Sequence, residues 1–281
     1  MLRRTGVTLV ELVVALSLGG IVLAVASGSL LRQQRAVRWI DGLSGAELQS
    51  RTVLRLLADE LEPLHAGDLA AGQASDSSLE LRAVVAASLT CDSAAAVTLV
   101  PESDAAPPLG VVARAPVVGD SVWLYRDSLG WRGHSVISVA RTTAACGVPT
   151  TASGPAYTLA LDAPAGVRAA TPVRVTRRER WVVYRAGDGR WQLGVRDWSA
   201  STSRFLAPQP VAGPFVRRTA DGRRTGFRFF DASDAEVVPD GTNEGTIARV
   251  RVTTLSAAPS TTGEGVRADS ADAVLSRPGA S

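Results

Sequence analysis

The chain has 281 residues, of which 46% are hydrophobic and 20% are charged, and its formal net charge is +3. Its two histidines, His65 and His134, stand alone, its two cysteines, Cys91 and Cys146, are far apart, and no glycine-rich phosphate loop follows a strand. The sequence therefore indicates no serine–histidine–acid catalytic triad. It also indicates no zinc site, because zinc ligands come in closely spaced pairs. We expect a protein that is not an enzyme and has no cofactor or metal.

The N-terminus joins a short basic leader to a long apolar run that contains one acid. Residues 1–6 (MLRRTG) end in glycine, residues 7–31 are apolar almost throughout, and Glu11 lies inside this run. As a helix the run is about 37 Å long, enough to cross a hydrocarbon core of about 30 Å. A carboxylate inside such a run costs about 2.5–3.5 kcal/mol on insertion scales, so Glu11 indicates a function beyond anchoring.

Three other interpretations of this segment are a cleaved secretory signal, an uncleaved signal anchor and a buried core helix. The apolar run is longer than the roughly 7–15 residues of a secretory signal. A plain anchor has no use for Glu11, and a core helix does not explain the length. The short basic leader favours a cytoplasmic N-terminus, which places everything after Arg32 outside the inner membrane.

The motif GVTLVEL at residues 6–12 resembles the N-terminal signal of type IV prepilins and type II secretion pseudopilins. Val7 stands where most of that family has phenylalanine. The resemblance implies cleavage between Gly6 and Val7 by a prepilin peptidase, N-methylation of Val7, and assembly with other pilins. It also implies that Glu11 of an incoming subunit pairs with the α-amine of its neighbour, because each group is costly to bury alone.

Beyond the apolar run, a stripe with alternating three- and four-residue spacing continues to Leu64. Its positions are Ile40, Leu43, Glu47, Ser50, Leu54, Leu57, Leu61 and Leu64. Pro63 marks the end, because proline favours extended backbone at the residue before it. We predict one helix from about Val7 to Leu61. Its part over 7–31 is a transmembrane and assembly helix, and the segment 32–64 is an amphipathic continuation that packs on a head domain.

The following residues predict short strands separated by turns. The strand-like segments are 79–84, 121–125, 134–139, 157–161, 178–185, 190–196, 226–230 and 246–254. A long helix followed only by strands predicts an α+β fold in which residues 65–256 form a mainly antiparallel β-sheet head. Residues 257–281, which are mostly small or polar, predict a disordered tail. The order of the last four strands resembles the large PilW-type minor pilins and the J-type pseudopilins.

The cysteines and the arginine clusters can each be interpreted in two ways. Cys91 and Cys146 lie beyond the membrane segment, in an oxidising compartment, and favour a disulfide over two free buried thiols. All 30 basic residues are arginine. The clusters at 177–180 and 217–224 either bind nucleic acid through phosphates or face solvent, and we favour solvent. An acidic group at 231–244 lacks the spacing of an EF-hand calcium loop.

These features predict a structural protein of the inner membrane with a cytoplasmic N-terminus and an extracytoplasmic head. Its expected partners are prepilin peptidase, other pilins and the membrane, with nucleic acid as a further alternative. The function we infer is that of a minor pilin or pseudopilin that is assembled into, primes or caps a type IV pilus or a type II secretion pseudopilus. The alternative is a signal-anchored extracytoplasmic module that binds DNA or a surface ligand.

Overall fold

The computed structural model describes the head and the helix that enters it. The described residues are 9, 23, 33–34, 44–45, 47–64, 68–69, 74–91, 96–101, 110–127, 129–146, 152–163, 166–260 and 263–275. The Gly6–Val7 cleavage site and Glu11 lie outside them, so the membrane-crossing half of the helix stays a prediction. In the described part of the chain, no helix combines the length and the apolar character needed to cross a bilayer.

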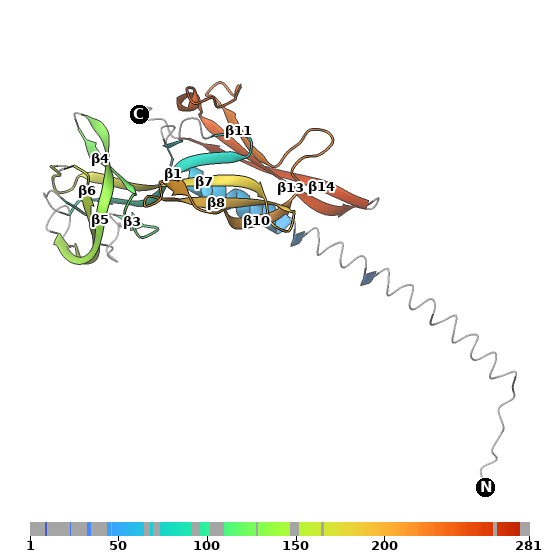
Figure 1. The fold of residues 1–281 in the computed structure, drawn as a ribbon, viewed down its shortest axis with the longest axis horizontal. Helices are drawn as coiled ribbons and strands as arrows, with labels where there is room; N and C mark the ends of the chain where they lie inside the picture. Colours follow the sequence, from blue (N-terminus) through green and yellow to red (C-terminus); the bar gives the residue numbers. More distant parts are fainter. Residues whose placement is uncertain are drawn as a thin grey trace, which may run out of the picture.

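Within these residues, an α-helix at 47–61 packs with two antiparallel sheets of ten and four strands (Figure 1). The large sheet has the order β10-β8-β7-β4-β5-β6-β2, with β1 also paired to β7, β3 to β1 and β9 to β8. The small sheet has the order β12-β11-β13-β14.

The strands of the large sheet are β1 Ser78–Leu89, β2 Val97–Thr98, β3 Val111–Val112, β4 Ser121–Arg126, β5 Gly130–Cys146, β6 Ala152–Leu161, β7 Pro172–Arg185, β8 Trp191–Ser199, β9 Arg204–Phe205 and β10 Gln209–Phe215. Those of the small sheet are β11 Gly226–Phe230, β12 Glu236–Val237, β13 Arg249–Ser260 and β14 Gly263–Val274, and a 3₁₀ helix, η2, spans Glu244–Thr246.

Strand β7 organises the large sheet because its two edges have different partners. One edge pairs with β1 from Val182 to Pro172. The other edge pairs with β4 over 173–176 and with β8 over 179–185. Beyond β7 the sheet therefore divides into two halves, one built on β8 and β10 and the other on β4, β5 and β6.

Two main hydrophobic clusters follow this division. The first, here called the proximal core, combines the helix with both sheets and includes Leu57, Leu61, Leu79, Leu81, Trp181, Leu193, Phe215, Phe227, Phe229 and Val250. The second, the distal core, includes Val85, Val97, Leu99, Val122, Leu124, Val136, Leu159, Leu161, Val173 and Val175. Figure 1 shows β4, β5 and β6 at one end of the head and the β13–β14 hairpin reaching toward the other.

The predicted strands are confirmed, most of them extend further than predicted, and the last one begins later than predicted. All eight segments overlap strands, namely β1, β4, β5, β6, β7, β8, β11 and β13. The last was predicted to begin at Thr246, yet β13 begins at Arg249. The reason is local, because the Thr246 amide donates to the Asn243 carbonyl at 2.9 Å and closes a 3₁₀ turn instead of joining the sheet.

The prediction of a disordered tail over 257–281 is wrong for the part that the structure describes, up to Leu275. Strand β13 continues to Ser260, and β14 pairs with it along its full length. The Nε of Arg251 lies 2.6 Å from Oδ1 of Asp272, and Ala273 and Leu275 are buried in the proximal core. Although its residues are mostly small or polar, β14 is an amphipathic strand, and its Asp272 pairs with Arg251 of β13. Composition alone does not reveal such a pairing.

Candidate assembly site

Residues 47–64, here called the head-bound helix, are the described part of the predicted assembly element. Residues 47–61 are helical and a turn follows them. The predicted processing and pairing residues Gly6, Val7 and Glu11 lie upstream, outside the described residues. The structure therefore defines how this element is attached to the head.

The apolar face of the head-bound helix is buried. Leu57, Leu61 and Leu64 have no exposed surface, and Leu54 is 7% exposed. These are predicted positions of the stripe, so the amphipathic interpretation is confirmed where the structure describes the helix. Val53, one turn before Leu57, is also buried, and the alternating spacing did not include it. Full burial of such a side chain stabilises the fold by about 1.5–3 kcal/mol.

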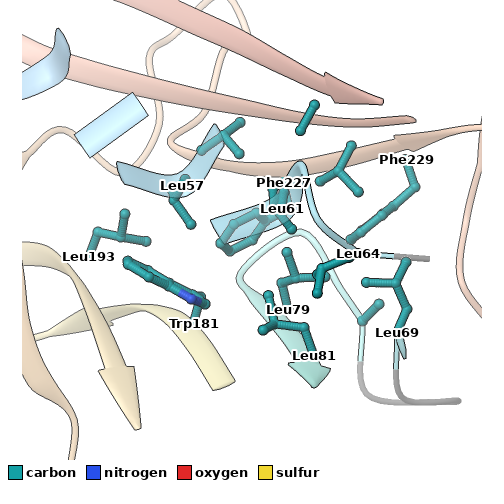
Figure 2. Packing of buried hydrophobic residues seen from close by; sticks show 14 of the residues in the cluster. Leu57, Leu61, Leu64, Leu69, Leu79, Leu81, Trp181, Leu193, Phe227 and Phe229 are labelled. Atoms are coloured by element: carbon teal, nitrogen blue, oxygen red, sulfur yellow. The ribbon is translucent and has the colours of Figure 1, made fainter. Parts of the chain in front are cut away.

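Both sheets contribute to the space that this face fills. Leu57 and Leu61 belong to one core cluster with Trp181 and Leu193 of the large sheet and Phe227 of the small sheet (Figure 2). Without the helix, each sheet would expose this apolar surface to water. The helix is therefore a structural part of the head.

Polar positions of the stripe make specific contacts with β13 and β14. Ser50 is buried, and its Oγ lies 2.9 Å from Oγ of Ser256, so the two hydroxyls satisfy each other. One turn earlier, Glu47 lies 3.1 Å from Nη1 of Arg267 and 2.5 Å from Nη2 of Arg51. The sequence pattern did not indicate these partners. Ser256, for example, is 206 residues from Ser50 in the chain.

A charged cluster lies near the end of the helix. Arg114 forms an ion pair with Glu179 of β7, and its Nη2 lies 3.5 Å from Oε1 of Glu60 on the helix. The side chain of Glu179 is only 2% exposed. Burial raises the pKa of the Glu179 carboxyl, the neighbouring Glu60 acts in the same direction, and Arg114 opposes both. The buried carboxyl therefore holds a proton more readily than a free glutamate does.

The turn that ends the helix is held by Arg174 of β7. Its Nη2 donates to the carbonyl of Pro63 at 3.0 Å and lies 2.8 Å from Oδ2 of the buried Asp68. A cation is favourable next to the carbonyl end of a helix, whose dipole is negative there. The helix is thus fixed at both of its ends and along its apolar face.

The two arginine clusters are engaged in ion pairs. Arg177 pairs with Asp120, Arg178 and Arg180 with Glu80, Arg217 and Arg224 with Asp76, and Arg223 with Asp221. The side chain of Glu80 is fully buried, and the Arg178 guanidinium also lies 4.0 Å from the centroid of the Trp198 ring. A phosphate would have to compete with these partners. The clusters are therefore neither a free basic surface nor a simply solvated strand.

The acidic group at 231–244 is dispersed in turns and ion pairs. Asp231 accepts bonds from the amides of Ser233 and Ala235, Asp240 accepts one from the amide of Thr242, and Asp234 and Glu236 pair with Arg249 and Arg228. Among the described residues, no three His, Cys, Asp or Glu side chains are placed to hold a metal ion.

A disulfide joins Cys91 and Cys146, whose Cα atoms are 5.0 Å apart and which are 55 residues apart in the chain. Cys91 follows β1 and Cys146 ends β5. Both are buried beside Val100. The bond links β1 to β5 in the distal half of the head.

One segment of the chain matches a known family model. Residues 1–27 match the prokaryotic N-terminal methylation motif, and they contain the prepilin-like residues 6–12. Comparison with curated proteins and with solved structures gave no match. The motif confirms the resemblance to type IV pilins and pseudopilins, and it does not distinguish among the subtypes of that family.

This motif supports a type IV pilin-like protein that is processed by prepilin peptidase. The motif implies assembly with other pilins and suggests a membrane-anchored, extracytoplasmic protein with a structural role.

Proposed function

We propose that the chain is a minor pilin or pseudopilin that is assembled into, primes or caps a type IV pilus or a type II secretion pseudopilus. The observation that carries the proposal is the methylation motif at residues 1–27. In this proposal, residues 1–6 are removed, residues 7–31 cross the membrane and later pack in the filament, and residues 32–64 connect them to the head. The burial of the head-bound helix between two sheets supports this division of roles.

Glu11 is the residue that we expect to guide assembly. Removal of residues 1–6 gives Val7 a free α-amine, with an ordinary pKa of about 7.7–8.0. A carboxylate and an amine cost much less to bury in an apolar helix bundle as a pair than separately. Pairing of Glu11 with the amine of the preceding subunit sets the stagger between their helices. Because the helix is built into the head, the same stagger sets the spacing of the heads.

The variant Glu11→Gln tests this mechanism. It is expected to insert and to lose its leader normally, yet to be incorporated poorly into filaments with partner pilins. Glu47→Gln is a matched control, because Glu47 lies on the same predicted helix but binds Arg51 and Arg267 at the head surface. Normal co-assembly of Glu11→Gln would reject the pairing mechanism.

The alternative of a signal-anchored module that binds DNA or a surface ligand predicts a different N-terminus. Such a protein would keep Met1 and would carry no N-methyl group on Val7. The ion-paired state of the arginine clusters gives the DNA alternative no specific support.

A further inference from the structure

The hairpin of β4 and β5 extends beyond the rest of the large sheet, at one end of the head (Figure 1). On one side, the last residue pair between β4 and β7 is Leu124 with Val173. On the other side, β6 pairs with β5 only from Val136 onward. Residues 125–127 and 129–131, here called the hairpin tip, therefore have no strand partner outside the hairpin among the described residues.

Three large apolar side chains of the hairpin tip face solvent. Tyr125 is 40% exposed, Leu129 is 52% exposed and Trp131 is 41% exposed. The rings of Tyr125 and Trp131 pack edge to face, with their centroids 5.5 Å apart. Exposed apolar side chains that gather in this way mark an interaction surface. Tyrosine and tryptophan combine an apolar body with a polar end, which suits the boundary between water and the hydrocarbon of a membrane.

A polar pocket of about 520 Å³ lies beside the hairpin tip. It is lined by Tyr125, Arg126 and Asp127 from the tip, and by Arg168 and residues 169–172 from the segment that leads into β7. Arg168 is exposed and forms no ion pair with any described residue. Two arginines and one aspartate give the lining a net positive charge. The pocket therefore favours a small anionic group, and its polar lining does not suit an acyl chain.

Arg132 adds a further cation beside this pocket. It is paired with Leu124 in the register of β4 and β5, and Leu124 also lines the pocket. Paired residues of neighbouring strands project from the same face of a sheet. Arg132 is exposed and, like Arg168, forms no ion pair with any residue that the structure describes. Unlike the two arginine clusters, this end of the head therefore has cations that a negatively charged partner can reach.

We propose that the hairpin tip docks onto a lipid bilayer that contains anionic phospholipid. The three apolar side chains of the tip enter the interfacial layer of the bilayer. Arg126 and Arg168 bind the phosphate of a lipid headgroup in the pocket, and Arg132 is attracted to the anionic surface. An apolar tip beside a polar, positively charged pocket matches the two layers of such a partner, with hydrocarbon next to charged headgroups.

The hairpin tip lies far from the point where the helix enters the head. The head-bound helix begins near β14, where Glu47 contacts Arg267, and it ends near β7, where Arg174 contacts Pro63. The tip lies beyond this second end (Figure 1). If residues 7–31 cross the inner membrane, the tip faces a second membrane. Only this assignment to a second membrane rests on the proposed function, and lipid binding by the tip does not.

The test uses the full-length chain, held in nanodiscs of phosphatidylcholine so that its apolar N-terminal segment is already in lipid. The nanodiscs are mixed with vesicles of phosphatidylcholine, either alone or with phosphatidylglycerol. Co-flotation over a series of lipid concentrations gives the affinity. We expect co-flotation with the anionic vesicles that weakens in high salt, and weaker binding to the neutral vesicles. Empty nanodiscs should not co-float with either.

Variants of the hairpin tip and the pocket separate the two contacts. Leu129→Ala with Trp131→Ala should lower the affinity about tenfold, because less apolar surface enters the bilayer. Arg168→Ala should lower the affinity for anionic vesicles roughly fivefold and leave that for neutral vesicles unchanged. Leu206→Ala with Val238→Ala replaces two exposed apolar residues elsewhere on the head (46% and 79% exposed) and should bind like the wild type. Circular dichroism checks that each variant is folded.

A second measurement uses the wild type and does not depend on the folding of a variant. Vesicles that carry a photo-activatable phosphatidylglycerol are irradiated with the nanodisc-held chain, and the adducts are located after digestion with trypsin. The chain has no lysine, so trypsin releases residues 127–132, with both Leu129 and Trp131, as one peptide. We expect adducts on this peptide and on the preceding one, residues 115–126, which contains Tyr125.

Several results would overturn the proposal. They are the absence of co-flotation with anionic vesicles, equal affinities of the wild type and the Leu129 and Trp131 double variant, and adducts that lie outside residues 115–132. Binding of an acidic polysaccharide or a single-stranded oligonucleotide, without binding of vesicles, would show that the partner is not a bilayer. N-methylated Val7, identified in chain purified from its native membrane, reports on the pilin assignment separately.

Discussion

The two halves of the head depend differently on the helix that enters it. The proximal core contains Leu57, Leu61 and Leu64 of the helix together with residues of both sheets, whereas the distal core contains only strand and loop residues among those that the structure describes. The distal half is closed instead by strand pairing and by the Cys91–Cys146 disulfide. The element expected to build the filament therefore also completes the proximal core of the head.

The largest effect is expected from a buried leucine of the helix. Leu61→Ala should lower the free energy of unfolding by about 3–5 kcal/mol, because it leaves a cavity in the proximal core. Hydrogen exchange of the full-length chain in detergent should accelerate first in β11, which packs in that core. Leu56→Ala is the control, since Leu56 is exposed and its change should stay within about 1 kcal/mol. Equal losses of stability from Leu61→Ala and Leu56→Ala would contradict the conclusion that Leu61 is a buried part of the proximal core.

Removal of the disulfide should weaken the other half. The double variant Cys91→Ser with Cys146→Ser is expected to lose about 2–4 kcal/mol, because the bond restricts a long loop in the unfolded chain. Hydrogen exchange should accelerate in β5 and β6 while β11 keeps its protection. Equal acceleration in both halves would show that the two cores unfold as one unit.

The charged cluster at the helix end should give a pH-dependent effect of intermediate size. The pKa of Glu179 is raised by burial above its ordinary value of 4.5. Ionisation of this group therefore opposes folding, so its contribution to stability falls as the pH rises from 4.5 through the raised pKa. Arg114→Ala should cost about 1–3 kcal/mol at neutral pH, where the carboxylate loses its cation.

That loss should fade in acid, where Glu179 is protonated and needs no cation. The measurement is denaturant unfolding of the wild type and of Arg114→Ala at a series of pH values. In the double variant Arg114→Ala with Glu179→Gln, the loss of stability relative to the wild type should depend much less on pH. If the stability loss of Arg114→Ala did not depend on pH, the proposed interaction between Arg114 and the ionised Glu179 would be rejected.

The smallest effect is expected in the hairpin of β13 and β14. Asp272 binds Arg249 and Arg251, and the hydrogen bond from Arg251 lowers the pKa of its carboxyl. Asp272→Asn should cost about 1 kcal/mol or less, because the pairs are partly exposed. The loss should begin to shrink as the pH falls below the ordinary pKa of an aspartate, and it should disappear once the pH has fallen through the lowered pKa of Asp272. A large loss that high salt does not reduce would show that the residue has another role.

Local patterns were predictable from the sequence, and distant partners were not. The buried leucines of the helix follow from the spacing of neighbours along the chain, and the prepilin-like motif is a contiguous string of residues. In contrast, Ser50 finds Ser256 across 206 residues, and Glu80 finds Arg178 across 98. No period or composition links such pairs.

The arginine clusters and the tail show the same limit. The acids that neutralise the clusters lie on other strands or loops, so the sequence shows the arginines without their partners. The small residues of β14 predicted a disordered tail. The segment is instead a strand, because it pairs with β13 along its full length. Gly6, Val7 and Glu11 remain predictions that rest on the sequence.

The mature N-terminus is the most direct test of the account. The full-length protein is isolated from its native membrane, and its N-terminal peptide is identified by mass spectrometry. The pilin assignment predicts that residues 1–6 are absent and that the chain begins at N-methylated Val7. A chain that still begins at Met1 would contradict it.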